Sequence, residues 1–312
     1  MAVRNFTTSS IKTNSQRNSF FSGAADLAPS TAIINNGSVY ESINLTFGGT
    51  NASFGNTNNA RSYAGALASS TRALAFGGYQ GTQRTIEYVT IATAGNGTTF
   101  GNLVNSKYFA AGSGSATRGI ISGGYPNTAY EYVTIATTGD ATAFGNATAG
   151  EKEALGAFSS PTRSVDFGGN GASGYNNGIR YVTIATTGNG TSFGDLTVAK
   201  RYTSGCSTSV RGISQGGQSA SGSSNYTNVI DYVTIATTGN ATDFGDLSAK
   251  RGFTASASNS TRGFCIGGRD TSDASVSAIE YVVISTTGNS VSFGNVTTTY
   301  LDSACSSAHG GL

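Results

Sequence analysis

The segment Tyr88-Val89-Thr90-Ile91-Ala92-Thr93 (YVTIAT) returns at regular intervals along the chain. The same string begins at Tyr132, Tyr181 and Tyr232, a variant YVVIST begins at Tyr281, and a degenerate copy YESINL begins at Tyr40. β-Branched residues in near alternation are typical of a half-buried strand. Successive copies begin 44 to 51 residues apart, which indicates a tandem array of similar units.

Two further markers keep a fixed order with this string. A Phe-Gly dipeptide follows each Tyr, at Phe54, Phe100, Phe144, Phe193, Phe244 and Phe293. An Arg precedes a short run that ends in a Gly pair, as at Arg72 with Gly77-Gly78 and at Arg211 with Gly216-Gly217. Between Tyr and Phe, the TTGN segments are expected to supply the positive φ angles of a tight hairpin.

Each unit therefore holds four short strand candidates, and none of its segments has a 3.6-residue period that would indicate a helix. Four antiparallel strands repeated in tandem predict an all-β fold, a six-bladed β-propeller. Small residues are expected in the innermost strands, which crowd the axis. The Phe and Tyr of each unit are predicted to fill the core, and Cys206, Cys265 and Cys305 are interpreted as small buried residues.

We expect an N-terminal arm at residues 1–16 and the propeller over 17–312. The predicted blades span about 17–56 together with 300–307, then 57–102, 103–146, 147–195, 196–246 and 247–295. In the first blade, Tyr300–Ser307 is predicted to supply the first strand, and Arg17–Gly23, Tyr40–Leu45 and Ser53–Gly55 the other three. Closure by a C-terminal strand and N-terminal strands in one blade leaves no free edge around the ring.

Composition and charge exclude several classes of protein. The 312 residues include 44 Gly and are rich in Ser, Thr and Asn, a composition that suggests disorder only where no period exists. The sequence contains no run of about 18 apolar residues, so no membrane-spanning helix is predicted. Met1–Gln16 lacks the apolar core of a secretory signal. The net charge of +2, without a basic block, gives little support for binding to nucleic acid.

Little catalytic chemistry is available in the sequence. The chain has a single histidine, His309, and no phosphate-binding glycine loop of the GxxxxGK[ST] type. We therefore expect no enzyme activity, no cofactor and no metal site. Asp140, Asp195, Asp243 and Asp246 lie near predicted turns, where solvated carboxylates are expected and calcium ligation is the alternative.

One face of the disc is the candidate for binding. Strand alternation places the second-to-third and fourth-to-first connections on this face, and the variable loops there are typical recognition elements. The candidate ligand-binding residues are Tyr79, Tyr125, Tyr175, Tyr226, Lys107, Lys200, Arg201, Lys250 and Arg251. A loose ring of cations would suit an anionic surface, and the alternative is that these cations bond between blades. For the tyrosines, the alternative to ligand contact is local packing.

The Gly pair, the two aromatic residues and the following cation, here Gly216-Gly217, Tyr232, Phe244 and Arg251, resemble a Kelch repeat. The resemblance covers almost the whole chain, although Phe-Gly stands where Kelch repeats usually carry Trp. The YVTIATTGN(A/G)T-FG(D/N)L units also resemble those of propeller proteins in marine tailed bacteriophages.

That resemblance implies a non-enzymatic virion protein of a tail fibre, an appendage or the capsid surface. Its expected partners are other virion proteins and a host-surface glycan or envelope protein, without nucleic acid and without membrane insertion. The main alternative is a bacterial or archaeal lectin-like adhesion module, for which the N-terminus shows no export signal. An intracellular Kelch adaptor and an enzyme are more distant alternatives.

Overall fold

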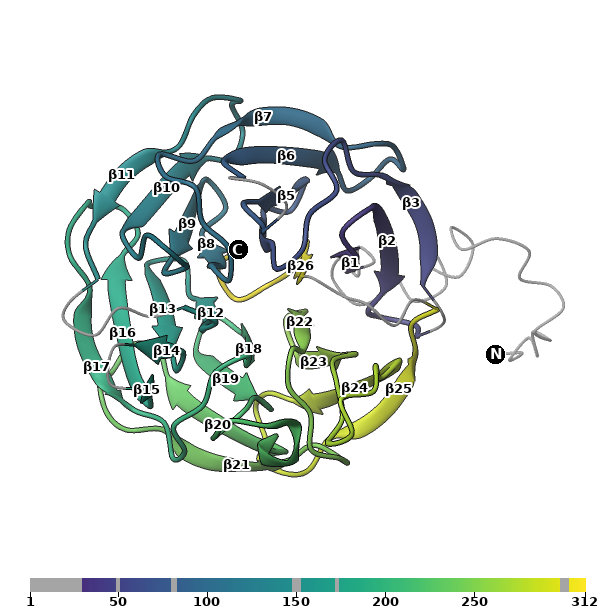
Figure 1. The fold of residues 1–312 in the computed structure, drawn as a ribbon, viewed down its shortest axis with the longest axis vertical. Coiled ribbons are helices and arrows are strands. Elements are labelled where there is room, and N and C mark those ends of the chain that lie inside the picture. The colour runs from purple at the N-terminus through teal and green to yellow at the C-terminus, as the bar shows by residue number, and fades with distance from the viewer. Residues whose placement is uncertain (1–29, 49–50, 80–82, 148–152, 172–173, 298–302) are drawn as a thin grey trace, which may run out of the picture.

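The chain forms a ring of six four-stranded antiparallel sheets around a central axis (Figure 1). The structure is a computed structural model, and it describes residues 30–48, 51–79, 83–147, 153–171, 174–297 and 303–312. Within these ranges the helical structure is limited to a 3₁₀ turn at Ser223–Asn225. None of the described helical structure is long or apolar enough to cross a bilayer. The predicted six-bladed propeller is confirmed.

In blades 2 to 6 the strands run from the axis outward in chain order (Figure 1). Blade 2 holds β4 (Gly65–Ala68), β5 (Arg72–Phe76), β6 (Thr85–Thr90) and β7 (Thr98–Asn102). Blade 3 holds β8 (Ala111–Gly114), β9 (Arg118–Ser122), β10 (Tyr130–Thr134) and β11 (Thr142–Gly145). Blade 4 holds β12 (Gly156–Ser159), β13 (Arg163–Phe167), β16 (Gly178–Thr183) and β17 (Thr191–Asp195), with a small hairpin of β14 (Asn170–Gly171) and β15 (Gly174–Tyr175). Blade 5 holds β18 (Ser204–Ser207), β19 (Arg211–Gln215), β20 (Val229–Thr234) and β21 (Thr242–Asp246), and blade 6 holds β22 (Ala255–Ser258), β23 (Arg262–Ile266), β24 (Ala278–Val283) and β25 (Val291–Asn295).

Blade 1 closes the ring in the predicted way, with one strand from the C-terminus. Its order is β26 (Ser303–Ser306), β1 (Thr31–Asn35), β2 (Val39–Asn44) and β3 (Ala52–Asn56). The prediction of Arg17–Gly23 as the second strand is wrong, because β1 pairs with both β26 and β2 in that place. The Arg-to-Gly marker pointed to the wrong segment, whereas the apolar run of β1 has the buried pattern of the other second strands. Arg17–Gly23, the arm at 1–16 and Tyr300–Asp302 lie outside the described residues.

The degenerate copy in blade 1 is offset by two residues from the predicted alignment. Tyr40 faces Gly55 in the β2–β3 register, as Ile86 faces Gly101 in blade 2. Ser42 therefore occupies the position of Tyr88. A two-residue shift keeps side chains on the same face of a strand, so the sequence pattern did not reveal it.

The core lies between blades. Each of six apolar clusters combines two neighbouring blades, for example Phe100 of blade 2 with Ile135 of blade 3. The Phe of the Phe-Gly dipeptide is buried in the first five copies, as predicted, and half-buried at Phe293. The repeated Tyr is only half-buried from Tyr88 to Tyr281, where it packs against the edge of these clusters and the repeated Arg lies over its ring.

The sequence markers join each blade to the next. The Arg118 guanidinium lies 4.4 Å from the centroid of the Tyr132 ring in its own blade, and its Nη1 donates to the carbonyls of Ile184 and Ala185 in blade 4. The N–H of Gly188 donates to the carbonyl of Phe144 in the preceding blade at 2.9 Å. The same bond joins the hairpin to the Phe-Gly segment at each of the four boundaries from blade 2 to blade 6.

The positive φ expected in the TTGN hairpins occurs in some of them, with φ of 153° at Gly288 and 159° at the equivalent Gly139. The other two, Gly188 and Gly239, have no positive φ, whereas Gly77 and Gly78 of the Gly pair have φ of 64° and 120°. The Gly pair is the position that requires glycine for its conformation. At the contact between blades it is the glycine of the Phe-Gly dipeptide that lacks room for a side chain, since a Cβ on Gly145 would lie 2.1 Å from the Gly188 carbonyl oxygen.

The C-terminal tail closes one end of the axial channel, and Figure 1 shows the C-terminus near the axis. Serine hydroxyls at the ends of the innermost strands donate to carbonyls of the preceding blade, as Ser159 Oγ donates to Gly114 and Ser207 Oγ to Ser159, both at 2.7 Å. Gly114 has no hydroxyl to continue this belt to Ala68. His309 Nε2 takes that place at 2.7 Å from the Ala68 carbonyl.

Candidate functional site

The loop face is the end of the disc opposite the C-terminal tail. Its second-to-third and fourth-to-first connections lie side by side, joined by isolated antiparallel bridges between Tyr108 and Tyr125, Arg201 and Gln218, and Gly252 and Arg269. These bridges hold the variable loops against the segments that lead into the innermost strands. The loops of this face are therefore fixed to the frame of the propeller at the described positions.

Five equivalent residues surround the mouth of the axial channel, and we call them the mouth ring: Tyr63, Phe109, Ala154, Tyr202 and Phe253. Each lies two residues before its innermost strand, and each has a left-handed backbone with φ between 52° and 58°. That conformation costs a non-glycine residue about 1–2 kcal/mol. Each backbone N–H from Phe109 onward donates to the carbonyl of the ring member in the preceding blade, at 2.8 to 3.0 Å.

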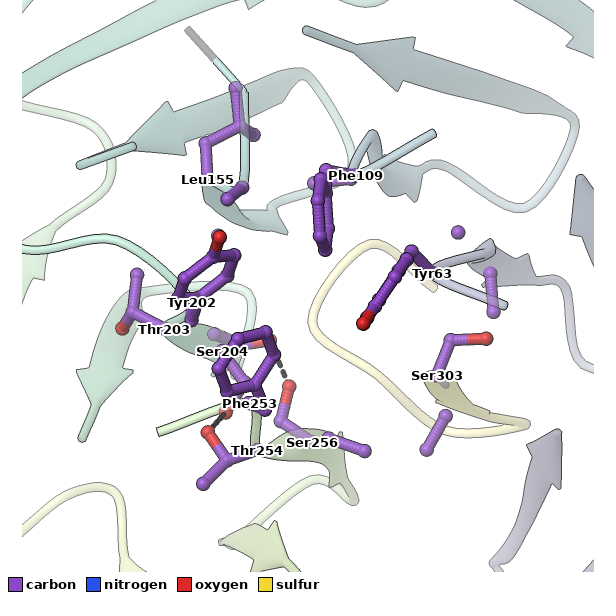
Figure 2. A pocket seen from close by; sticks show the side chains of 18 of the residues that line it. Tyr63, Phe109, Leu155, Tyr202, Thr203, Ser204, Phe253, Thr254, Ser256 and Ser303 are labelled. Atoms are coloured by element: carbon purple, nitrogen blue, oxygen red, sulfur yellow. Dashed lines mark hydrogen bonds between the residues drawn. The ribbon is translucent and has the colours of Figure 1, made fainter. Parts of the chain in front are cut away.

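This hydrogen-bonded belt explains how the strain is maintained and directs the side chains toward the axis. Figure 2 shows the four aromatic rings gathered around the pocket. Tyr63 and Phe109 have ring centroids 4.3 Å apart, and Tyr202 and Phe253 stack at 3.8 Å with planes 20° apart. The cavity at this mouth has a volume of about 160 Å³ and continues down between the innermost strands.

Our sequence analysis missed the aromatic members of this ring. The signal was present, since each ring member stands two residues after a repeated cation: Arg61, Lys107, Lys152, Lys200 and Arg251. Because aromatic residues were attributed to the core, this spacing was not interpreted as a separate marker. Strained backbone at equivalent positions is a pointer to function that only coordinates can supply.

An aromatic arm extends from the mouth ring over blades 2 and 3, and it consists of Tyr79, Tyr108 and Tyr125. Tyr79 lies 6.4 Å from Tyr63 and 5.1 Å from Tyr108 between ring centroids, and Tyr108 lies 5.4 Å from Tyr125. Tyr79 and Tyr125 are 59% and 52% exposed. Two of the four predicted loop tyrosines thus belong to a continuous aromatic surface that reaches the axis.

A stack of alternating rings and guanidinium groups lies on the other side of the mouth, and we call it the arginine ladder. Its members in order are Tyr175, Arg201, Tyr202, Phe253 and Arg269. Arg201 lies 4.9 Å from the ring centroid of Tyr175 and 4.5 Å from that of Tyr202. Arg269 lies 5.6 Å from the Phe253 centroid. The predicted residues Tyr175 and Arg201 are therefore in direct contact with each other, and Arg201 also contacts Tyr202 of the mouth ring.

Three predicted cations do not face solvent, which corrects the expectation of a loose basic ring. Lys107, Lys200 and Arg251 are almost fully buried and pair with Glu131, Asp231 and Glu280, respectively. Each pair joins the segment before the innermost strand to the third strand of the same blade, so the predicted alternative of bonding between blades does not describe these ion pairs either. Burial lowers the pKa of Lys107 and Lys200, and the facing carboxylates oppose that shift. Lys250 is exposed, and Lys152 lies outside the described residues.

Tyr226 is also buried, and its hydroxyl donates to Asp273 Oδ1 at 3.2 Å. Burial, with a further contribution from the Asp273 carboxylate, raises the pKa of Tyr226 to about 12. Burial likewise raises the pKa of Tyr202. Both hydroxyls are protonated at neutral pH and can donate hydrogen bonds.

The described residues contain no group of three or more His, Cys, Asp or Glu side chains suited to a metal ion. Cys206 and Cys265 are buried, as predicted, and Cys305 is partly buried. No family model matches this chain, and no curated protein is significantly similar to it.

Proposed function

We propose that this protein is a non-enzymatic recognition protein of a bacteriophage virion and that its loop face binds a glycan on the host surface. The observation that supports binding is the continuous aromatic surface formed by the aromatic arm and the mouth ring. Two of its tyrosines are more than half exposed, although the exposure of aromatic surface to water is unfavourable. Exposed aromatic faces of this kind suit the C–H face of a sugar, and the adjacent hydroxyls and amides suit its hydroxyl groups.

The virion assignment is supported by the resemblance of the tandem units to phage propeller proteins of Kelch-like pattern. On this proposal, the disc belongs to a tail fibre, an appendage or the capsid surface, from which its loop face meets the host. In each place, the opposite face or the rim remains for contact with another virion subunit. A lectin-like adhesion module of a bacterium would use the same aromatic surface and is the alternative.

Two measurements test the proposal. Mass spectrometry of purified particles should find the chain, and a chain that is absent from particles but binds glycans would favour the bacterial module. On a glycan array, the wild type should bind, and the double variant Tyr79→Ala/Tyr125→Ala should lose most of the signal. Phe47→Ala is the matched control, because Phe47 is 44% exposed on the opposite face. Equal binding by all three proteins would contradict the assignment of the loop face.

A further inference from the structure

Arg201 is held in a fixed orientation with most of its hydrogen-bonding capacity unused. Its Nε donates to Gln218 Oε1 at 3.0 Å, and Gln218 is itself buried and donates through Nε2 to the Gly222 carbonyl at 3.0 Å. The rings of Tyr175 and Tyr202 both contact the guanidinium. The four N–H bonds on Nη1 and Nη2 have no partner among the described residues, and no described carboxylate forms an ion pair with Arg201.

Four of the five other arginines that lie over tyrosine rings differ in this respect, and the fifth, Arg262, lies over Tyr281 on the opposite face. Nη1 of Arg72, Arg118, Arg163 and Arg211 donates to two carbonyls of the next blade in every case. Arg269, at the end of the arginine ladder, is neutralised by Asp273 at 3.0 Å. Arg201 is therefore the arginine of the ladder that has both an unpaired charge and free donors in a planar fork.

We propose that Arg201 is an anion-recognising group and that the glycan bound by the loop face carries an acidic substituent, a carboxylate or a sulfate. This inference rests on the proposed function. A guanidinium fork binds a planar carboxylate through two parallel hydrogen bonds, and such charge-assisted bonds are stronger than neutral ones. Because Gln218 and two rings already hold the side chain in place, little side-chain entropy remains to be lost on binding.

The position of Arg201 links the charge to the aromatic surface. Tyr202 contacts both Arg201 and the mouth ring, and Phe109 lies 5.3 Å from Tyr202 between centroids. An acidic sugar at the mouth can therefore contact the guanidinium while the rest of the glycan extends over Tyr79 and Tyr125. A purely neutral glycan would leave the guanidinium without a partner.

The test is an array that pairs uronate-, sialate- and sulfate-bearing glycans with neutral glycans of the same backbone. The wild type should prefer the acidic member of a pair by about 10- to 100-fold in Kd, and Arg201→Gln should abolish that preference. Arg262→Gln is the matched control, since Arg262 lies over the Tyr281 ring on the opposite face. Thermal unfolding of each variant verifies that it is folded. The pairs distinguish carboxylate from sulfate as the recognised group.

Preference for the neutral members, or an acidic preference that survives Arg201→Gln, would overturn this inference and leave the proposed function intact. Failure of the wild type to bind any glycan would overturn both. Binding of polyglutamate in place of every glycan would show a peptide ligand and would likewise overturn both.

Discussion

Phe253 stacks on Tyr202 with their ring centroids 3.8 Å apart, although the two residues belong to the entrances of successive blades and both have a left-handed backbone. The Phe253 N–H donates to the Tyr202 carbonyl at 2.9 Å. The backbone belt thus forces the side chains of neighbouring blades together. The backbone strain of a mouth-ring residue should be measurable as a change in the free energy of unfolding where that residue has no aromatic side chain that packs against its neighbours.

Ala154 is that member. Ala154→Gly should raise the free energy of unfolding by up to about 1 kcal/mol, because glycine adopts positive φ without the steric cost that alanine has there. Chemical denaturation measures the change. The control Ala157→Gly lies within strand β12, where glycine only adds freedom to the unfolded chain, and it should lower stability. A loss of stability in both variants would show that Ala154 is not strained.

The buried pair of Lys200 and Asp231 should behave as a unit. Their charged atoms lie 3.2 Å apart and both side chains have 0% exposure. Asp231→Asn leaves the buried ammonium without its counter-ion and should cost about 3–5 kcal/mol. The double variant Lys200→Met/Asp231→Asn removes the buried charge and should recover most of that loss. Thermal unfolding measures the stability of each variant. Equal stability of the single and double variants would contradict this account.

His309 should make stability depend on pH in a narrow window. Its Nε2 donates to the Ala68 carbonyl and its Nδ1 accepts from the Gly311 N–H at 3.1 Å, so the folded state holds the neutral ring. Burial lowers the pKa of His309 below its ordinary value of about 6.5. The unfolded chain therefore takes up the proton first as the pH falls, and stability decreases from about pH 6.5 downward until the folded pKa is passed.

His309 is the one histidine of the chain, so no other imidazole titrates near pH 6.5, and ordinary carboxylates titrate at lower pH. His309→Ala should lose about 1 kcal/mol at pH 7 and should show a flat stability profile between about pH 6.5 and pH 5. Unfolding midpoints measured across that range compare the two proteins. A wild-type profile as flat as that of the variant would rule out the buried neutral imidazole.

Gly145 and Gly188 lie on opposite sides of one contact between blades. A Cβ on Gly145 would lie 2.1 Å from the Gly188 carbonyl oxygen, whereas a Cβ on Gly188 would meet nothing within 4 Å. Gly145→Ala should therefore cost about 1–3 kcal/mol or more through overpacking, and Gly188→Ala should have little effect. Thermal unfolding of the two variants provides the comparison, and equal midpoints would show that the contact is not tight.

Much of the fold follows from sequence spacing because its elements are local. Each hairpin joins strands that are near in the chain, and the period of Tyr, Phe and Gly counts the blades directly. The same method misaligned blade 1, where Tyr40 stands in the position of Ile86. The site was predicted less well. Tyr79, Tyr125, Tyr175 and Arg201 lie together on the loop face, whereas Lys107, Lys200, Arg251 and Tyr226 are buried.

The amino-acid sequence by itself determined the repeat, the four strands of blades 2 to 6 and the closure by a C-terminal strand, because these depend on periodicity and on strand pairing. Only the tertiary structure decided which cations are buried, which aromatic rings meet at the mouth, and where the tail ends. These features depend on contacts around the ring, such as the one between His309 and Ala68 across 241 positions. A linear pattern carries no information about which side chains a closed ring brings to its axis.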